Sequence, residues 1–214
     1  MKNYVITILD NKRSVQVADR CIRTAAANGL TVEKFKAITP KDNLELLLKQ
    51  EGINPMHFVE QYSRTDNCIA AFMSHYSLWK LCAAGTEEFT IFEHDAVVVA
   101  PIPEFIPYQQ VISLGKPSYG KFNTPPLLGV NVLTSKQYFP GAHAYRLKPA
   151  GARALIAVAQ VRAAPTDVFL HLQTFPFLEE YYPWPVEADD SFTTIQKTNG
   201  CLAKHNYNET YEII

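Results

Sequence analysis

The chain has no apolar run that is long enough to cross a membrane. A spanning helix needs about 20 consecutive apolar residues, and every apolar run in this sequence is interrupted well before that length. The first run, residues 4–9, is also too short for the core of a secretory signal peptide. We therefore expect no integral membrane span and a cytoplasmic location.

Paired cysteines and a glycine-rich phosphate loop are also lacking. The four cysteines lie far apart and form no CxxC pair, so we expect reduced thiols and neither a disulfide framework nor a zinc site. The turn after the first apolar run reads LDNKRS, where a dinucleotide-binding fold carries glycines. NAD-type chemistry is therefore not expected.

A basic excess, which is typical of nucleic-acid-binding proteins, is missing as well. The 20 Lys and Arg residues against 21 Asp and Glu residues give a formal net charge of -1. This balance argues against nucleic acid as the dominant ligand. With 47% hydrophobic residues in 214 positions, and neither a linker nor an internal repeat, we expect one globular domain over residues 1–214.

Hydrophobic periodicity predicts alternating strands and helices. The first strand, helix and strand fall within forty residues, which indicates a βαβ unit and an α/β fold with a parallel sheet. Strands are expected at 4–9, 31–38, 87–100, 110–115, 127–134 and 143–148. Helices are expected at 14–28, 42–50, 55–62, 66–84 and 149–162.

The segment EEFTIFEHDAVVVA, residues 87–100, places three ionisable side chains inside an apolar run. In a continuous strand, Glu93 and Asp95 point to one side and His94 to the other. Open α/β sheets bind ligands at the carboxyl ends of their strands, and carboxylates there suit Mg²⁺ or Mn²⁺. On spacing alone, the more common case is a strand that simply ends in a polar turn, and the apolar continuation AVVVA shifts this only slightly toward the metal site.

Four segments follow one another in an order that resembles a known family. They read SHYSLW (74–79), FEHDAVV (92–98), GAHAYRLKPAGARALI (141–156) and PTDVFL (165–170). Together they resemble glycosyltransferase family 25, the lipopolysaccharide-biosynthesis and collagen-galactosyltransferase type. The resemblance implies a single-domain, GT-A-like (Rossmann-like) fold with a mixed, mainly parallel sheet flanked by helices. Residues 1–100 would form the nucleotide-sugar-binding half and residues 101–214 the acceptor side.

The resemblance implies an enzyme that moves a sugar from a nucleotide-sugar to an acceptor hydroxyl, with inversion and with Mn²⁺ or Mg²⁺. Asp95 and Glu93 would hold the metal, and His205 would be a late ligand. His94 replaces the family's central acid, and imidazole suits Mn²⁺ better than Mg²⁺. His94 also favours the alternative function, a degenerate member that binds nucleotide-sugar or glycan without transfer.

The same resemblance implies a set of donor contacts. For Ser74 and His75 the alternative is packing at a buried helix, and for Arg13 it is a solvated turn charge. Trp79 is expected in the core, and Arg20 is a further candidate contact to the nucleotide. The residues implied to contact the donor are Asp10, Arg13, Ser74, His75, Glu93 and His94.

Asp167 matches the acid of the family's Pro-x-Asp segment and would be the general base for the acceptor hydroxyl. Its alternative role is to cap a following helix. Asp189 and Asp190 are rival bases, since adjacent carboxylates raise one another's pKa. His143 and Tyr145 are expected to face the pocket.

A surface saccharide is the acceptor that the resemblance implies first. A soluble acceptor, such as hydroxylated bases of phage DNA, is the second possibility. In that case Lys116, Lys121 and Lys136 would contact phosphates.

Overall fold

The computed structural model describes residues 1–58, 63–189, 192–196 and 212–213. Its centre is a seven-stranded sheet in the order β2-β1-β3-β7-β5-β8-β6. Five of these strands run in one direction, while β7 and β6 run against their neighbours. The strands are β1 Lys2–Thr7, β2 Glu33–Lys36, β3 Phe89–Glu93, β5 Val111–Ser113, β6 Gly129–Val132, β7 Ala144–Leu147 and β8 Leu178–Tyr182. The predicted mixed, mainly parallel sheet is confirmed.

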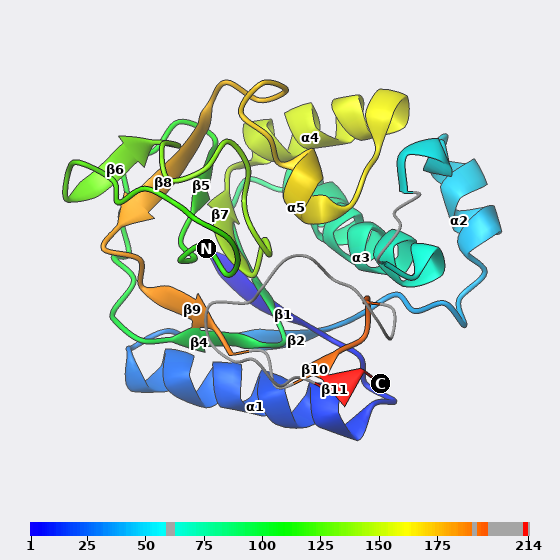
Figure 1. Ribbon diagram of the computed structural model, residues 1–214, viewed down its shortest axis with the longest axis horizontal. Helices are drawn as coiled ribbons and strands as arrows, with labels where there is room; N and C mark the ends of the chain where they lie inside the picture. Colours follow the sequence, from blue (N-terminus) through cyan, green and yellow to red (C-terminus); the bar gives the residue numbers. More distant parts are fainter. Residues whose placement is uncertain (59–62, 190–191, 197–211, 214) are drawn as a thin grey trace.

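Helices cover both faces of this sheet. Figure 1 shows α1 along one side, and α3, α4 and α5 on the other. Two hydrophobic cores follow from this layering, one that contains α3 and α4 and one that contains α1. The helices are α1 Lys12–Ala27, α2 Leu44–Glu51, the 3₁₀ helix η1 Pro55–Phe58, α3 Thr65–Ala84, α4 Pro149–Arg162 and α5 Thr166–Phe169.

The predicted strand at 87–100 is wrong in one respect, because it is two strands. β3 ends at Glu93, the chain turns at His94 and Asp95, and β4 (Ala96–Val98) pairs with β9 (Val186–Ala188) in a separate small sheet. A further short pair joins β10 (Phe192–Thr193) to β11 (Glu212–Ile213). The alternation of side chains along β3 therefore stops at Glu93.

Helix α4 approaches the sheet closely at Gly151. A Cβ atom at this position would lie 2.6 Å from the carbonyl oxygen of Gln110, just before β5. Glycine is therefore needed here for the contact between helix and strand, and not for conformational freedom.

Strand β8 was not predicted from the sequence, because Glu179 and Glu180 stand in its middle. Both side chains are buried, and both accept backbone hydrogen bonds. The Glu180 carboxylate receives the N–H groups of Thr134 and Ser135 at 2.7 and 2.8 Å. One oxygen of each carboxylate is thus hydrogen-bonded inside the fold by loops that are distant in sequence, whereas Oε2 of Glu180 is buried without a hydrogen-bond partner.

Candidate functional site

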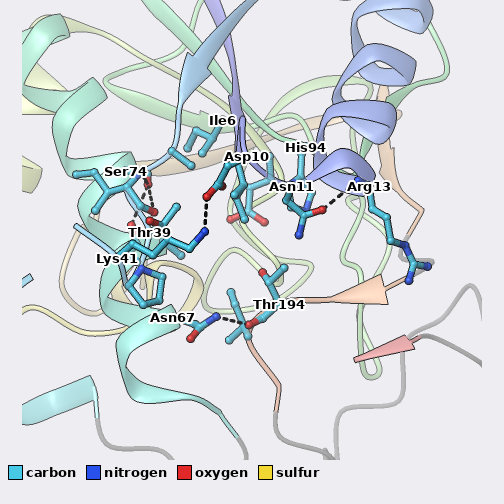
Figure 2. Close-up of a pocket in the computed structure, with 18 of the residues that line it drawn as sticks. Ile6, Asp10, Asn11, Arg13, Thr39, Lys41, Asn67, Ser74, His94 and Thr194 are labelled. Atoms are coloured by element: carbon cyan, nitrogen blue, oxygen red, sulfur yellow. Dashed lines mark hydrogen bonds and ion pairs between the residues drawn. The ribbon is translucent and has the colours of Figure 1, made fainter. Parts of the chain in front are cut away.

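A cavity of about 630 Å³ opens at the carboxyl ends of β1 and β3 (Figure 2). The two strands are parallel neighbours, so their ends lie at the same edge of the sheet. The turn after β1, the first turn of α1, the segment after β2, one face of α3 and the turn after β3 all contribute to its wall. This is the edge at which α/β sheets bind ligands.

All six residues that the sequence implied as donor contacts line this cavity. They come from three regions of the chain: the turn into α1, the middle of α3 and the end of β3. Sequence reasoning missed other lining residues, because only the tertiary fold brings their segments to this edge. Among the missed residues are Asn11, Thr39, Lys41, Asn67 and Thr194.

The first turn of α1 makes one side of the cavity positive. It carries Lys12 and Arg13 and no acidic residue, although the N-terminus of a helix already has partial positive charge. Asn11 caps the helix by accepting hydrogen bonds from the backbone N–H groups of Arg13 and Ser14 at 3.0 and 3.2 Å. Cations at this end disfavour the helix but suit a bound anion such as a phosphate.

Asp10 and Lys41 form an exposed ion pair at the rim of the cavity, with 2.5 Å between Oδ2 and Nζ. The hydrogen bond from Lys41 lowers the pKa of Asp10 and raises that of Lys41. Figure 2 shows this pair beside Asn11, with Arg13 farther along the same wall. The Arg13 guanidinium lies 4.9 Å from the centre of the Phe192 ring.

His94 faces the cavity as a neutral hydrogen-bonding group. Its Nδ1 atom lies 2.8 Å from the hydroxyl of Ser14, which itself accepts the backbone N–H of Ile8 at 2.9 Å. The Ile8 N–H and the Ser14 hydroxyl both have an acceptor when Ser14 donates to Nδ1, and the neutral ring then carries its proton on Nε2. Burial lowers the pKa of His94, which agrees with a neutral ring.

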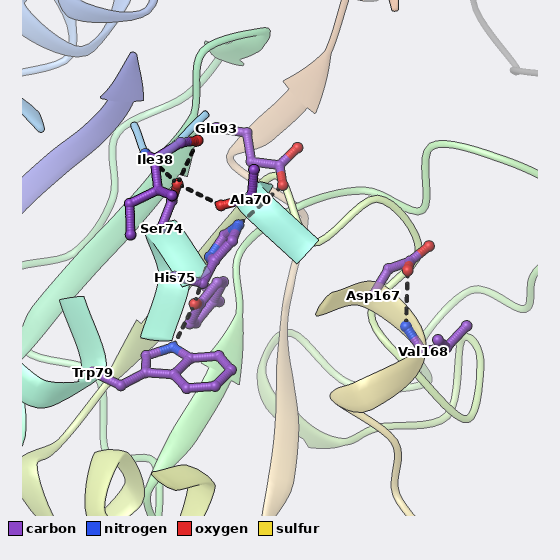
Figure 3. A network of polar contacts seen from close by, with 9 residues as sticks. Ile38, Ala70, Ser74, His75, Trp79, Glu93, Asp167 and Val168 are labelled. Atoms are coloured by element: carbon purple, nitrogen blue, oxygen red, sulfur yellow. Dashed lines mark hydrogen bonds and ion pairs between the residues drawn. The ribbon is translucent and has the colours of Figure 1, made fainter. Parts of the chain in front are cut away.

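His75 is almost fully buried and links Glu93 to the core (Figure 3). Its Nε2 atom lies 3.0 Å from Oε1 of Glu93, and its Nδ1 atom lies 2.9 Å from the Tyr145 hydroxyl. Burial lowers the pKa of His75 to about 3, so the ring is neutral at physiological pH.

Ser74 fixes the position of α3 against the segment after β2. Its hydroxyl accepts the backbone N–H of Ile38 and donates to the carbonyl of Ala70, both at 2.8 Å. The cavity wall is therefore held by a hydrogen bond between two of the elements that form it.

The residues implied as metal ligands are only partly brought together. Glu93 lines the cavity, whereas Asp95 is not among the lining residues, and its carbonyl accepts from Arg20 at 3.3 Å. His205 lies outside the described residues. Within the described part of the chain, no three His, Cys, Asp or Glu residues form a group that fits a metal ion.

Of the candidate bases, Asp167 and Asp189 lie apart from the cavity wall. Asp167 sits in the first turn of α5 and accepts from the Tyr119 hydroxyl and from the backbone N–H of Val168. Burial, together with the charge of Asp167, raises the pKa of Tyr119. Asp189 pairs with Arg20 at the surface, and Asp190 lies outside the described residues. Figure 3 shows Asp167 away from the network around Glu93.

Several other candidates have structural partners. Trp79 is fully buried in the core, as expected. His143 and Tyr145 are buried and do not line the cavity, so the expectation that they face it is wrong; the Tyr145 hydroxyl instead contacts His75 and Trp79 of α3. Lys116 pairs with Glu187, and Lys136 donates to the carbonyl of Tyr119.

A mixed α/β sheet of this kind, with a phosphate-suited cavity at its strand ends, is typical of α/β proteins that bind nucleotides. Residues 1–109 match the family described as Glycosyltransferase family 25 (LPS biosynthesis protein). The match covers half of the chain, and the protein belongs to this family of glycosyltransferases, which use nucleotide-sugar donors. A comparison with curated proteins found no match.

The matched residues contain SHYSLW and FEHDAVV and end before the segments at 141–156 and 165–170. The resemblance of those later segments therefore stays a prediction. Among the helices in the described ranges, none combines the length and the apolar character that a membrane crossing requires.

Proposed function

We propose that the cavity binds the nucleotide-sugar donor and that the enzyme transfers its sugar to a hydroxyl of a saccharide acceptor. One observation carries the proposal: six donor-contact candidates from three separate regions of the chain line one cavity. Its volume of about 630 Å³ is within the range of small-molecule sites.

The chemistry of the wall suggests how the donor lies. Apolar side chains, including Ile8 and Ile38, line the part of the cavity near β2 and suit the flat nucleoside. The start of α1, with Lys12 and Arg13, suits the diphosphate. Glu93 then accepts a hydroxyl of the donor, and the Nε2–H of His94 donates to an oxygen.

The acceptor side is proposed to be formed by residues 101–214, in keeping with the division of the domain into two halves. The family's description points to a saccharide of the lipopolysaccharide type. Asp167 is the proposed base, and the Tyr119 hydroxyl orients its carboxylate. Direct displacement by the acceptor hydroxyl would invert the configuration at the transferred sugar.

The resemblance also implies Mn²⁺ or Mg²⁺, which neutralises charge on a departing diphosphate. Of the implied ligands, Glu93 and Asp95 lie within the described residues and do not make a complete site, so no step is derived through the ion. The variant Asp95→Asn tests this part. A folded variant without transfer activity supports an ion at Asp95, whereas an unchanged transfer rate would contradict the proposal that an ion binds there.

Calorimetry with UDP, GDP, CDP and ADP, each with and without Mn²⁺, tests donor binding. One diphosphate should bind, and Glu93→Gln should weaken the matching nucleotide-sugar by about tenfold or more. Hydrolysis of that nucleotide-sugar, measured next, separates an enzyme from the degenerate alternative. Binding without any turnover on saccharide acceptors would favour the alternative, and no binding of any diphosphate would overturn the proposal.

A further inference from the structure

Three buried side chains behind the cavity form one hydrogen-bonded chain that ends on Glu93 (Figure 3). The indole Nε1 of Trp79 lies 2.7 Å from the Tyr145 hydroxyl. The same hydroxyl lies 2.9 Å from Nδ1 of His75, and Nε2 of His75 lies 3.0 Å from Oε1 of Glu93. Two elements, α3 and β7, supply the three buried members.

The direction of each bond follows from what each group is able to donate. An indole N–H only donates, so Tyr145 accepts from Trp79. The single hydroxyl proton of Tyr145 then goes to Nδ1 of His75. Nδ1 therefore carries no proton, and the neutral ring carries its proton on Nε2, from which it donates to Glu93.

The burial of these side chains excludes the other protonation states of His75. Trp79 and Tyr145 are 0% exposed and His75 is 1% exposed, so water does not replace a missing partner. If His75 were protonated on both nitrogens, the Tyr145 hydroxyl would face two donors and its own proton would lose its acceptor. A buried donor without an acceptor is unfavourable, and the buried charge adds a further cost.

We propose that Trp79 and Tyr145 fix His75 as its Nε2–H tautomer, and that His75 positions the Glu93 carboxylate to accept a hydroxyl of the nucleotide-sugar. Trp79, Tyr145 and His75 are positioning residues, since they act through Glu93. The second half of the proposal rests on the proposed donor function of the cavity, and the first half does not.

The tautomer is tested by NMR on protein with ¹⁵N-labelled histidine, without any ligand. Long-range ¹H–¹⁵N correlations at neutral pH should show His75 as a neutral ring protonated on Nε2. In Tyr145→Phe this pattern should change, because Nδ1 loses its donor. A ring protonated on Nδ1, or on both nitrogens at neutral pH, would overturn the assignment whether or not a donor binds.

Two substitutions of His75 separate its two nitrogens. Glutamine places an amide near Nε2 and still donates to Glu93, whereas asparagine reaches only the region of Nδ1, next to Tyr145. We expect affinity for the nucleotide-sugar to fall about threefold in His75→Gln and about thirtyfold in His75→Asn. Circular dichroism and thermal unfolding confirm that each variant is folded.

A double-mutant cycle with Glu93→Gln completes the test. If His75 acts through Glu93, His75→Asn should add little to the loss that Glu93→Gln causes alone. Fully additive losses, or equal losses in the glutamine and asparagine variants, would overturn the positioning role. If Glu93→Gln itself leaves donor affinity unchanged, the proposed donor contact is wrong. The tautomer of His75 is then still decided by the NMR measurement, which does not depend on donor binding.

Discussion

The Ser14 hydroxyl joins the end of β1 to the turn after β3, because it lies 2.8 Å from Nδ1 of His94 and accepts the backbone N–H of Ile8. Ser14 is fully buried, and His94 is 80 residues away in sequence. A single hydroxyl in the first turn of α1 thus holds together two edges of the cavity.

Replacing Ser14 with alanine should lower the free energy of unfolding by about 1–3 kcal/mol, because Ile8 N–H and His94 both lose a buried partner. Urea denaturation measures the change. Ser77→Ala is the matched control, since the Ser77 hydroxyl only donates to the carbonyl of Met73 within α3. Equal stability of the two variants would show that the Ser14 link is energetically unimportant.

Lys12→Ala and Arg13→Ala should each weaken binding of a nucleoside diphosphate by about tenfold, because each removes a positive charge near the phosphates. Affinity for the nucleoside without phosphate should change little. Calorimetry at two salt concentrations checks both statements. Arg23→Ala, an exposed arginine on the same helix that does not line the cavity, should bind like the unmodified protein. A similar loss in Arg23→Ala would indicate a general effect of charge.

Asp167→Asn should reduce kcat by about a hundredfold or more and leave the affinity for nucleoside diphosphate unchanged, because Asp167 does not line the donor cavity. Steady-state kinetics with a saccharide acceptor, together with calorimetry, separate the two quantities. Asp19→Asn, which affects only an ion pair with Lys34 on the outer surface of α1 and β2, is the control. An unchanged kcat would leave Asp167 as a structural partner of Tyr119.

Stability should fall as the pH is lowered below about 6.5, the value near which histidine titrates in an unfolded chain. Burial lowers the pKa of His75 to about 3, and burial also lowers the pKa values of His94 and His143. Below this pH the unfolded chain therefore binds protons that the folded protein does not bind. Each histidine lowers the free energy of unfolding by up to about 1.4 kcal/mol for each pH unit of acidification. Above pH 6.5 these histidines are neutral in both states, so they do not change the stability with pH.

Urea denaturation at pH 7.5, 6.0 and 5.0 measures this dependence. In His75→Gln the free energy of unfolding should depend less steeply on pH, by the contribution of one histidine. A slope that is the same in the variant and in the unmodified protein would contradict a His75 that stays neutral in the fold.

Gly151→Ala should destabilise the protein by about 1–3 kcal/mol, although alanine favours a helix over glycine. The added Cβ would lie 2.6 Å from the carbonyl oxygen of Gln110 and 2.9 Å from Cγ2 of Val111, so α4 must move from the sheet. Thermal unfolding measures the loss. At Gly85 a Cβ would make ordinary contacts at 3.6 Å or more, and Gly85→Ala should change the stability much less.

Sequence periodicity predicted the elements whose faces are regular. The expected helices at 66–84 and 149–162 are α3 (Thr65–Ala84) and α4 (Pro149–Arg162), because apolar spacing and the terminal Gly85 and Pro149 define both locally. The break after β3 was not predictable in this way. No glycine, asparagine or proline marks it, and bonds from Ser14, Arg20 and Asp189 hold the turn.

The same distinction explains the site. The donor-contact candidates were implied by the family resemblance, and they meet in the structure because they lie at strand ends or on one side of α3. Asn67 and Thr194 complete the wall through a side-chain hydrogen bond of 2.6 Å between segments 127 residues apart, which no local pattern reveals. The buried Glu179 and Glu180 concealed β8 for a related reason, since their partners come from distant loops.

The burial of His75 has a consequence for how the enzyme responds to acid. Its ring stays neutral until the pH approaches about 3, whereas the fold as a whole loses stability from about pH 6.5 downward. Mild acidification should therefore leave the donor affinity of each folded molecule the same and reduce the number of folded molecules. Acid inactivation of this enzyme should accordingly follow unfolding, and return to neutral pH should restore activity to the extent that the chain refolds.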